Sequence, residues 1–426
     1  MQQQDWRPTR LSTASWAIYD LANTIFALGV GSLFFAEWLT DNRSGIPSWL
    51  LHNDTPDLAL AITIDLAMIV VIVLGPWIGS RSDHSGRRRG YLIPTTLLCV
   101  VPTFFLASGS IAGSLVLYAV ALVGFNLGGV VYDAMLPDVS TPQNIGLVSG
   151  VGIGVGYVGS FIAVVVGMLL LDDYGHAMVF KVIAVLFVLF AIPTFTLVRE
   201  RPRPALTGPP PAFSASFRRL RRSWKDASTY PGVIRFLVGR FFYTDAVNTL
   251  IAGFLTIYVK EELGFTSDQV QALLGVSIVG AMIGGFGGGF LVDRVGPRRL
   301  LHSVLYLWLA AFAVGITAGI VDVGALGWPL GLLGGIALGG LWAADRVYMA
   351  RISPPARLGE FYGLYAAVGR FATVLGPLLF GLLVSLLGFP REVALGALMV
   401  LVLVSRVILG AVDDTPRDWT DADLTV

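Results

Sequence analysis

About twelve apolar runs of roughly 18 to 27 residues divide this 426-residue sequence, and each is long enough to cross a bilayer as a helix. Charged side chains make up 13% of the chain, against about 25% in soluble domains. The runs lack the strict alternation that barrel strands require. The sequence therefore predicts an all-α integral membrane protein with twelve transmembrane helices, near residues 14–39, 58–80, 91–109, 114–136, 145–171, 177–198, 233–259, 269–292, 300–320, 326–350, 361–387 and 393–411.

Positive charge is distributed unevenly between alternate loops. If the N-terminus lies inside, most of the 29 Lys and Arg residues fall on the cytoplasmic side, and the outer loops hold only Arg43, Lys181, Lys260 and Arg391. Because cytoplasmic loops retain positive charge, both termini are predicted to be cytoplasmic, and the compact loops favour a bacterial inner membrane. The first ten residues contain no signal-peptide core, and the single Cys99 excludes an internal disulfide and a cysteine metal site.

Three sets of residues recur at nearly constant distances along the chain. Asp20, Asn23, Thr24 and Ala27 return 225 residues later as Asp245, Asn248, Thr249 and Ala252. Glycines and charges of the loop after the second run return at 210, and five residues between Asp138 and Gly150 have counterparts at 213. These repeats predict two pseudo-symmetric six-helix bundles at 1–198 and 232–411, joined by a cytoplasmic linker at 199–231 and followed by a tail at 412–426.

Asp20, Asn23 and Thr24 form a narrow polar stripe inside an apolar run. Positions i, i+3, i+4 and i+7 share one helix face, and a charged face does not turn to lipid. Asp20 and Asp245 lie about ten residues from the cytoplasmic ends of their runs, hence roughly 15 Å deep, near the midplane where transporter sites lie. The alternative is that both acids are architectural, capped by neighbouring amides and hydroxyls. The predicted substrate site consists of Tyr19, Asp20, Asn23, Asn126, Tyr243, Asp245, Asn248 and Arg370.

A loop rich in glycine and arginine follows the second run and again the eighth. Its first copy reads Gly79-x-x-x-Asp83-x-x-Gly86-Arg87-Arg88-Arg89, and Gly289, Asp293, Gly296 and Arg298 keep the spacing in the second. In a duplicated twelve-span chain, this loop resembles that of the major facilitator superfamily, and the resemblance covers the whole chain.

The physical role expected of this loop is a cytoplasmic gate. Glycines let helix ends approach, and acids and arginines form ion pairs that hold one conformation closed. The alternative is that the arginines only anchor the topology. The predicted gate consists of Asp83, Arg87, Arg88, Asp133, Asp138, Asp293, Arg298, Asp345 and Arg346.

Shorter stretches narrow the resemblance. Residues 16–24, 132–138 and 148–150 are similar to the vacuole-effluxer-like permease family of that superfamily. Fungal members of the family export amino acids from the vacuole, so the resemblance implies an amino-acid-like solute.

Five aspartates and four arginines fall within the apolar runs. An unpaired charge at the bilayer centre costs about 2.5–3.5 kcal/mol on insertion scales, so most of them must be paired, neutral or hydrated. Arg370 suits a solute carboxylate, although an acid at the gate is an alternative partner. Asp65 is assigned to an outer gate, and Asn126 either lines the cavity or packs. Arg240 and Arg406 are expected to snorkel or to pair structurally.

The linker at 199–231 holds six prolines and a dense run of positive charge. Phe213, Phe217, Leu220 and Trp224 recur in it at helical spacing opposite four arginines, which predicts a basic amphipathic helix on the anionic cytoplasmic leaflet. Nucleic acid is the alternative partner for such charge, but a linker tethered to a membrane domain meets lipid first. The acidic tail is expected to be disordered.

Other motifs are discounted. Gly154-x-Gly156-x-x-Gly159 has the spacing of a dinucleotide-binding loop but lies inside an apolar run, where glycines allow close helix packing. The sequence has no phosphate-binding lysine motif, so ATP hydrolysis is not expected. The four histidines are scattered along the chain, at His52, His84, His176 and His302. The sequence shows no catalytic cluster. It therefore predicts no bound metal, no other cofactor and no enzyme activity.

Together these features predict a secondary transporter of a small solute that exposes a midplane cavity alternately to each side of the membrane. Asp20 or Asp245 is expected to carry a coupling proton, because exclusion of water disfavours the charged form. Sodium coupling and facilitated diffusion remain open. A lipid or hydrophobic-drug translocase and a non-transporting membrane sensor are the alternative functions, and the paired polar stripes count against both. The fold needs no second copy to enclose a pathway, so a monomer is expected.

Overall fold

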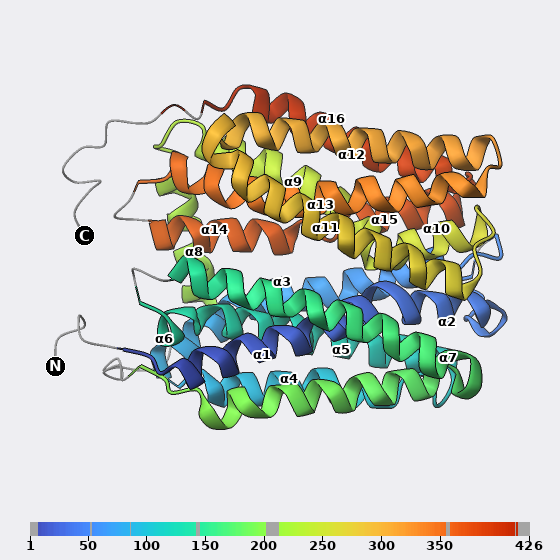
Figure 1. Ribbon diagram of the computed structural model, residues 1–426, viewed down its shortest axis with the longest axis horizontal. Coiled ribbons are helices and arrows are strands. Elements are labelled where there is room, and N and C mark those ends of the chain that lie inside the picture. The colour runs from blue at the N-terminus through green and yellow to red at the C-terminus, as the bar shows by residue number, and fades with distance from the viewer. Residues whose placement is uncertain are drawn as a thin grey trace. The chain divides into compact units, whose positions relative to one another are not determined.

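The computed structural model is built from helices and loops, and its described residues include no β-strand (Figure 1). The structure describes residues 7–51, 53–85, 87–141, 145–201, 213–354, 358–413 and 415. Parts of the predicted linker and tail, at 202–212 and 416–426, lie outside these residues. So do Gly86 and Pro142 of the repeated motifs.

The chain separates into two compact units. The first contains Met1–Ser48 and Leu66–Ser216, and the second contains Trp49–Asp65 and Phe217–Val426. Helix α3 therefore begins in the second unit and continues in the first.

The first unit is built on long helices with one irregular segment in the first span. Thr9 caps the first helix by accepting a hydrogen bond from the backbone N–H of Ser12 at 3.1 Å. Helix α7 bends at Gly175, whose φ of 70° suits glycine. The elements are α1 (Arg10–Phe26), the π-helical η2 (Ala27–Phe34), α2 (Phe35–Asp41), η3 (Arg43–Gly45), α3 (Asp57–Ser85), α4 (Arg89–Phe104), α5 (Ile111–Ala134), α6 (Leu136–Val139) and α7 (Ile145–Leu197).

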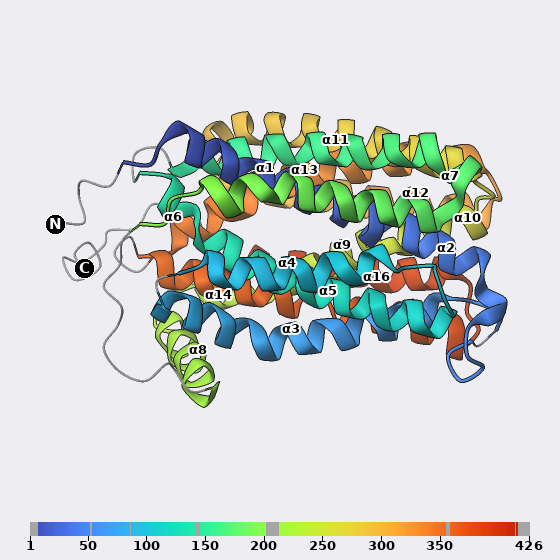
Figure 2. The ribbon, with the colours of Figure 1, turned by 90° about the horizontal axis from the view of Figure 1, so that it is seen from below.

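The second unit repeats this pattern and adds the linker helix α8, which runs in a different direction from α12 (Figure 2). Its elements are α8 (Phe213–Ala227), α9 (Val233–Thr249), the π-helical η4 (Leu250–Phe254), α10 (Leu255–Glu261), α11 (Ser267–Val295), α12 (Pro297–Ile320), η5 (Gly324–Leu326), α13 (Gly327–Ile352), α14 (Leu358–Phe371), α15 (Leu375–Gly381), the π-helical η7 (Leu382–Leu386) and α16 (Arg391–Gly410).

Glycines bring pairs of helices into backbone contact within each unit. In the first unit, a Cβ at Gly159 of α7 would collide with the backbone oxygen of Leu21 in α1. In the second, a Cβ at Gly284 of α11 would collide with the backbone oxygen of Ile336 in α13. The glycine-rich motif in α7 thus serves helix packing, as the sequence predicts. Gly154 of the same motif has open space beside it.

Ten helices among the described residues are long and apolar enough to cross a membrane, judged by length and composition. The sequence predicts twelve runs, and the two numbers differ at two places. The element α7 covers both the fifth and the sixth runs, and its two helical parts meet at Gly175, whose backbone is not helical. Helix α4, over the third run, has 16 residues. The prediction of an all-α membrane protein is confirmed.

Candidate functional site

The polar stripe of the first unit occupies one half-buried face of the first span. Thr24 donates a hydrogen bond from its hydroxyl to the backbone oxygen of Asp20 at 2.8 Å, which ties the stripe together. The stripe residues are half-buried and the residues between them are buried, so this face is the open side of the helix: Asp20, Asn23, Thr24 and Ala27 against Leu21, Ala22, Ile25 and Phe26.

Two glycines of α7 lie directly against the carboxylate of Asp20. A Cβ at Gly156 would stand 3.1 Å from Oδ2 of Asp20 and 2.9 Å from Oγ1 of Thr24. A Cβ at Gly152 would stand 3.0 Å from the Trp16 ring and 3.8 Å from the same Oδ2. The missing side chains therefore leave room for the acid inside an otherwise apolar helix pair.

The stripe of the second unit repeats the local bonding of the first and is more deeply buried. Thr249 donates to the backbone oxygen of Asp245 at 2.7 Å, as Thr24 does to Asp20. Asp245 is fully buried, and no side chain among the described residues hydrogen-bonds its carboxylate oxygens. The backbone at Gly376 of α15 lies beside it.

The eleventh span is broken next to this second stripe. Helix α14 ends at Phe371, one residue after Arg370, and α15 begins at Leu375. Asn248 donates from Nδ2 to the backbone oxygen of Ala372 at 3.2 Å, so it binds a carbonyl that the break leaves outside the helix. The structure thus brings together Asp245, Asn248 and the break that follows Arg370.

π-Helical segments follow both stripes. Segment η2 starts at Ala27 and η4 at Leu250, where Gly253 adopts a φ of 101°. Such interruptions release backbone groups from the regular helical ladder, and they occur often at functional sites of membrane transporters. The two spans that carry the acids are therefore irregular just beyond them.

A buried ion pair lies behind the second stripe. Arg240 of α9 is 3% exposed, and its Nε lies 3.3 Å from Oδ2 of the fully buried Asp345 in α13. Tyr243 and Tyr365 donate hydrogen bonds to the same oxygen at 3.2 and 2.7 Å. The Arg240 guanidinium also stacks over the Tyr365 ring at 3.6 Å and donates to the backbone oxygen of that residue.

This network gives the partners of two residues that the sequence singles out, Asp345 and Arg240. Asp345, a predicted gate residue, has its carboxylate at the centre of this network inside the second unit. Arg240, expected to snorkel or to pair structurally, is buried and paired. Neither residue's partner can be read from the sequence, because Arg240 and Asp345 are 105 positions apart.

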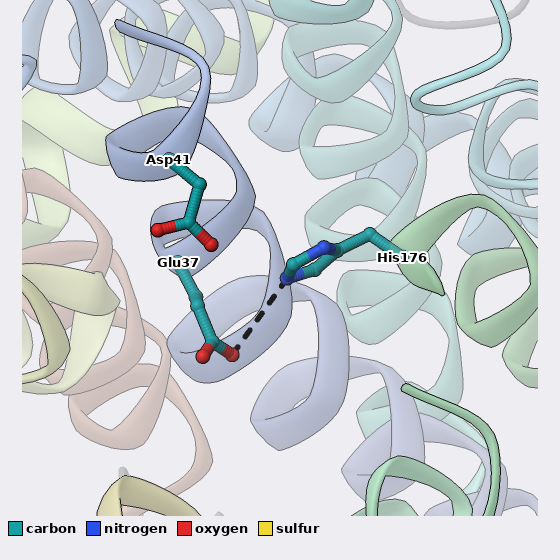
Figure 3. Close-up of side chains that lie close together, drawn as sticks. All are labelled: Glu37, Asp41 and His176. Atoms are coloured by element: carbon teal, nitrogen blue, oxygen red, sulfur yellow. Dashed lines mark ion pairs between the residues drawn. The ribbon is translucent and has the colours of Figure 1, made fainter. Parts of the chain in front are cut away.

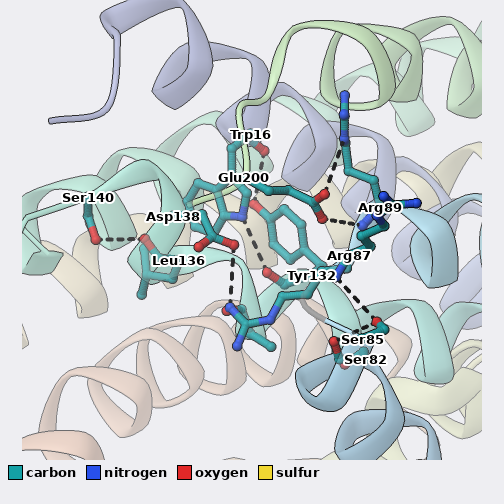
Figure 4. Close-up of polar contacts among 12 residues, drawn as sticks. Trp16, Ser82, Ser85, Arg87, Arg89, Tyr132, Leu136, Asp138, Ser140 and Glu200 are labelled. Carbon is teal, nitrogen blue, oxygen red and sulfur yellow. Dashed lines mark hydrogen bonds and ion pairs between the residues drawn. The ribbon is translucent and has the colours of Figure 1, made fainter. Parts of the chain in front are cut away.

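An aromatic cluster lies behind the first stripe. Tyr132 stacks on Trp16 with ring centroids 4.6 Å apart and on Tyr19 at 5.0 Å. Trp16 donates from Nε1 to the backbone oxygen of Tyr132, and Tyr132 donates to that of Trp16 (Figure 4). The Tyr19 hydroxyl shares a hydrogen bond of 2.6 Å with Thr96. Tyr19 is therefore packed within the first unit.

The arginine loop of the first unit forms a second polar cluster (Figure 4). Arg88 lies 3.4 Å from Oδ2 of the fully buried Asp138 and also donates to the backbone oxygen of Ala134. Arg89 binds Glu200 through its backbone N–H at 2.6 Å and through its side chain at 3.8 Å. The structure thus pairs Arg88 with Asp138, two predicted gate residues, and adds Glu200, which is not among the predicted residues.

The remaining predicted residues are dispersed. Arg87 and Asp133 are exposed, as is Arg346. Arg298 donates to the backbone oxygen of Gly410 at 2.7 Å, and Asn126 to that of Leu122 in its own helix at 2.9 Å. The side chains of Asp83 and Asp293 lie outside the described part of the structure.

Two acids near the start of α3, Asp57 and Asp65, belong to the second unit. Asp57 makes two hydrogen bonds with Arg391 at 2.8 and 3.2 Å, and Glu262 accepts a third from Arg391 at 2.7 Å. Asp65 is 6% exposed, its carboxylate makes no hydrogen bond to any described residue, and it lies close enough to Asp245 for the two acids to interact electrostatically. Asp65 and Asp245 are therefore two buried acids in one unit.

Two solved structures share this fold along almost the whole chain. A bacterial homologue of the human lysosomal transporter Spinster, solved in an inward-facing, unoccupied conformation, gives a TM-score of 0.67 at 16% identity, with 94% of this chain and 95% of that chain covered. A variant of the nucleoside transporter NupG gives a TM-score of 0.69 at 13% identity, with 93% and 99% covered. The fold is that of the major facilitator superfamily, as the sequence predicts.

The family follows from the sequence comparisons. The model described as "Vacuole effluxer Atg22 like" matches residues 58–418, and the chain belongs to this family. It is 27% identical to an uncharacterized MFS-type transporter, YxiO of Bacillus subtilis, over 95% of both chains. It is 28% identical to Autophagy-related protein 22-1 of Aspergillus niger over 62% of this chain, which spans 46% of the fungal protein. The chain is an integral membrane transporter of the major facilitator type.

Proposed function

We propose that the protein is a secondary transporter that moves a small polar or zwitterionic, amino-acid-like solute by alternating access. The duplicated stripe carries the proposal. Asp20 and Asp245 occupy equivalent positions, each accepts a threonine hydrogen bond at its backbone oxygen, and a π-helical segment follows each. The effluxer description of the family supports a solute as the ligand.

Each unit contributes its own polar groups to solute binding. The first contributes Asp20 and Asn23, on the half-buried face of α1. Asn126 of α5 is a further candidate from the same unit. The second contributes Asp245, Asn248 and Arg370, at the break between α14 and α15. Arginine binds carboxylates in a planar, two-point fashion, so Arg370 suits the acidic group of an amino acid. Tyr19 and Tyr243 are buried and bonded to Thr96 and Asp345, so they position the stripes.

Proton coupling is the second part of the proposal. Burial away from water favours the neutral, protonated form of a carboxyl group, and neutralisation removes the cost of moving the acid through an apolar surrounding. Asp245 has no hydrogen bond from a described side chain, and a second buried acid, Asp65, lies close enough to interact with it electrostatically. Asp245 is therefore the favoured proton carrier, with Asp20 as its counterpart.

Further proposals concern the membrane location, topology and oligomeric state of the protein. We propose a bacterial inner membrane, cytoplasmic termini, a monomer, and α8 on the anionic leaflet, where the exposed Arg218, Arg221 and Arg222 would meet lipid headgroups. The Arg88 to Asp138 pair would belong to the cytoplasmic gate. Neither catalysis nor nucleic-acid binding forms part of the proposal.

One observation favours a lipid ligand instead. A groove of about 440 Å³ in the first unit, between α4 and α7, is lined by apolar side chains alone: Val100, Val101, Phe104, Phe105, Ala184, Val185, Val188, Leu189 and Ile192. Acyl chains of the bilayer suit such a groove. The groove contains no group that would recognise a polar solute. A lipid bound in it would not account for the two polar stripes.

A ligand screen tests the proposal. Purified protein would be heated in the presence of amino acids, short peptides, sugars, phospholipids and cationic dyes, and its melting temperature compared with that of the free protein. We expect amino acids to raise it, because a ligand that binds only the folded state stabilises that state. Asp245→Asn should reduce the rise, whereas Asp268→Asn, an exposed acid in the first turn of α11, should not. Stabilisation by lipids or dyes alone would contradict the proposal.

A further inference from the structure

A histidine and two acids lie close together in the first unit (Figure 3). Glu37 and Asp41 are one turn apart on α2, so they share a face of that helix. His176 follows Gly175, the residue at which α7 bends. One ligand atom from each of the three lies within 4.8 Å of the other two.

The spacing of these atoms is wider than a hydrogen bond. Nε2 of His176 lies 3.7 Å from Oε2 of Glu37 and makes no hydrogen bond to any described residue. Two ligands that each lie about 2.1 Å from a tetrahedral metal ion are about 3.4 Å apart. The observed separation is therefore close to that of two ligands of one ion.

The burial of the three residues gives a reason for a cation. Glu37 is fully buried, the His176 side chain is 15% exposed, and Asp41 is exposed. A carboxylate oxygen and an imidazole nitrogen are both ligands for a divalent ion, and a buried carboxylate favours positive charge beside it. A divalent ion supplies that charge while using the lone pair of the same imidazole.

We propose that Glu37, Asp41 and His176 bind a divalent transition-metal ion of the zinc class. Imidazole together with carboxylates suits Zn²⁺, whereas Ca²⁺ and Mg²⁺ prefer oxygen ligands alone. The exposed Asp41 leaves the remaining coordination positions open to water. The ion would join α2 to α7 in the first unit. The site shares no residue with either stripe and does not depend on the proposed transport activity.

Zinc binding to the purified full-length protein tests the proposal. The protein would be prepared with a histidine-free tag, stripped with chelator, and titrated with Zn²⁺ against a chelating dye. We expect one Zn²⁺ per chain. His176→Ala and Glu37→Gln should weaken binding at least about tenfold, since loss of even an outer-shell partner costs 10–100-fold. Asp173→Asn, an exposed acid on the same helix, is the matched control and should bind like the unchanged protein.

A second variant guards against loss of folding. His176→Cys keeps a metal ligand but replaces nitrogen by a thiolate, which prefers softer ions. It should bind Cd²⁺ more tightly than the unchanged protein and show a cadmium–thiolate absorption band. The unchanged protein, whose only cysteine is the buried Cys99, is the blank. Absence of the band, or equal Zn²⁺ affinity in His176→Ala and the unchanged protein, would overturn the proposal.

Discussion

The two units present the same polar stripe and support it by different means. Behind Asp20, Trp16 and Tyr19 stack on Tyr132. Behind Asp245, a buried ion pair between Arg240 and Asp345 receives two tyrosine hydroxyls from Tyr243 and Tyr365. The repeat offsets show which residues correspond in the two units. Asp345 and Tyr365 stand 213 positions after Tyr132 and Gly152, and Arg240 stands 225 positions after Ser15.

The difference shows that the duplicated architecture does not require a particular chemistry behind its stripe. Aromatic packing divides its stabilisation among several contacts, each worth about 0.5–1.5 kcal/mol. A buried ion pair concentrates it, since loss of one partner leaves an unpaired charge and costs about 3–5 kcal/mol. The second unit should therefore be the more sensitive of the two to single changes. Its acid is also the more buried, since Asp245 is enclosed and Asp20 is half-buried.

The largest effect is expected at the ion pair. Arg240→Met leaves the Asp345 carboxylate buried without its counter-charge and should lower the free energy of unfolding by about 3–5 kcal/mol. Unfolding of the purified protein by SDS would measure it. The control in the first unit is Tyr132→Phe, which removes one hydrogen bond to Trp16 and should cost about 0.5–1.5 kcal/mol. Equal losses in both variants would remove the contrast between the units.

A smaller effect, equal in the two units, is expected where helices touch through glycine. Gly159→Ala and Gly284→Ala each place a methyl group against a backbone oxygen and should destabilise by about 1–3 kcal/mol. Gly154→Ala is the control, because nothing lies within 4 Å of its Cβ position. The same SDS titration applies. A neutral Gly159→Ala variant would show that α1 and α7 are not in backbone contact.

The smallest effect separates the two asparagines. Asn248→Ala loses the hydrogen bond to Ala372 and should cost about 0.5–1.5 kcal/mol, with faster amide exchange around residues 372–374. Asn23→Ala removes no side-chain hydrogen bond among the described residues and should change stability by less than about 0.5 kcal/mol. Unchanged exchange in Asn248→Ala would mean that this asparagine does not hold the break.

Much of the fold follows from the sequence, because the length of an apolar run and the offset between repeats are one-dimensional quantities. The position of Asp20 and Asp245 on one helix face also follows from spacing alone. The break after Arg370 is not among the predictions, although Gly376-Pro377 signals it: proline cannot donate to the carbonyl four residues earlier.

Contacts between distant segments could not be predicted in the same way. Depth along a helix can be counted from the sequence, but the direction in which a side chain points cannot, so the contact between Asp345 and Arg240 is not predicted. The proximity of His176 to Glu37 and Asp41 cannot be read from the sequence, because the two acids lie on another helix. The pairing of Asp57 with Arg391 joins residues 334 positions apart.

Solute accumulation in proteoliposomes tests the central claim, that Asp245 carries the coupling charge, most directly. The solute identified by the ligand screen would be followed with and without an imposed pH gradient. Asp245→Asn should abolish gradient-driven accumulation while retaining exchange of solute across the membrane, and Asp20→Asn should weaken both. Gradient-driven accumulation by Asp245→Asn at the level of the unchanged protein would contradict the account.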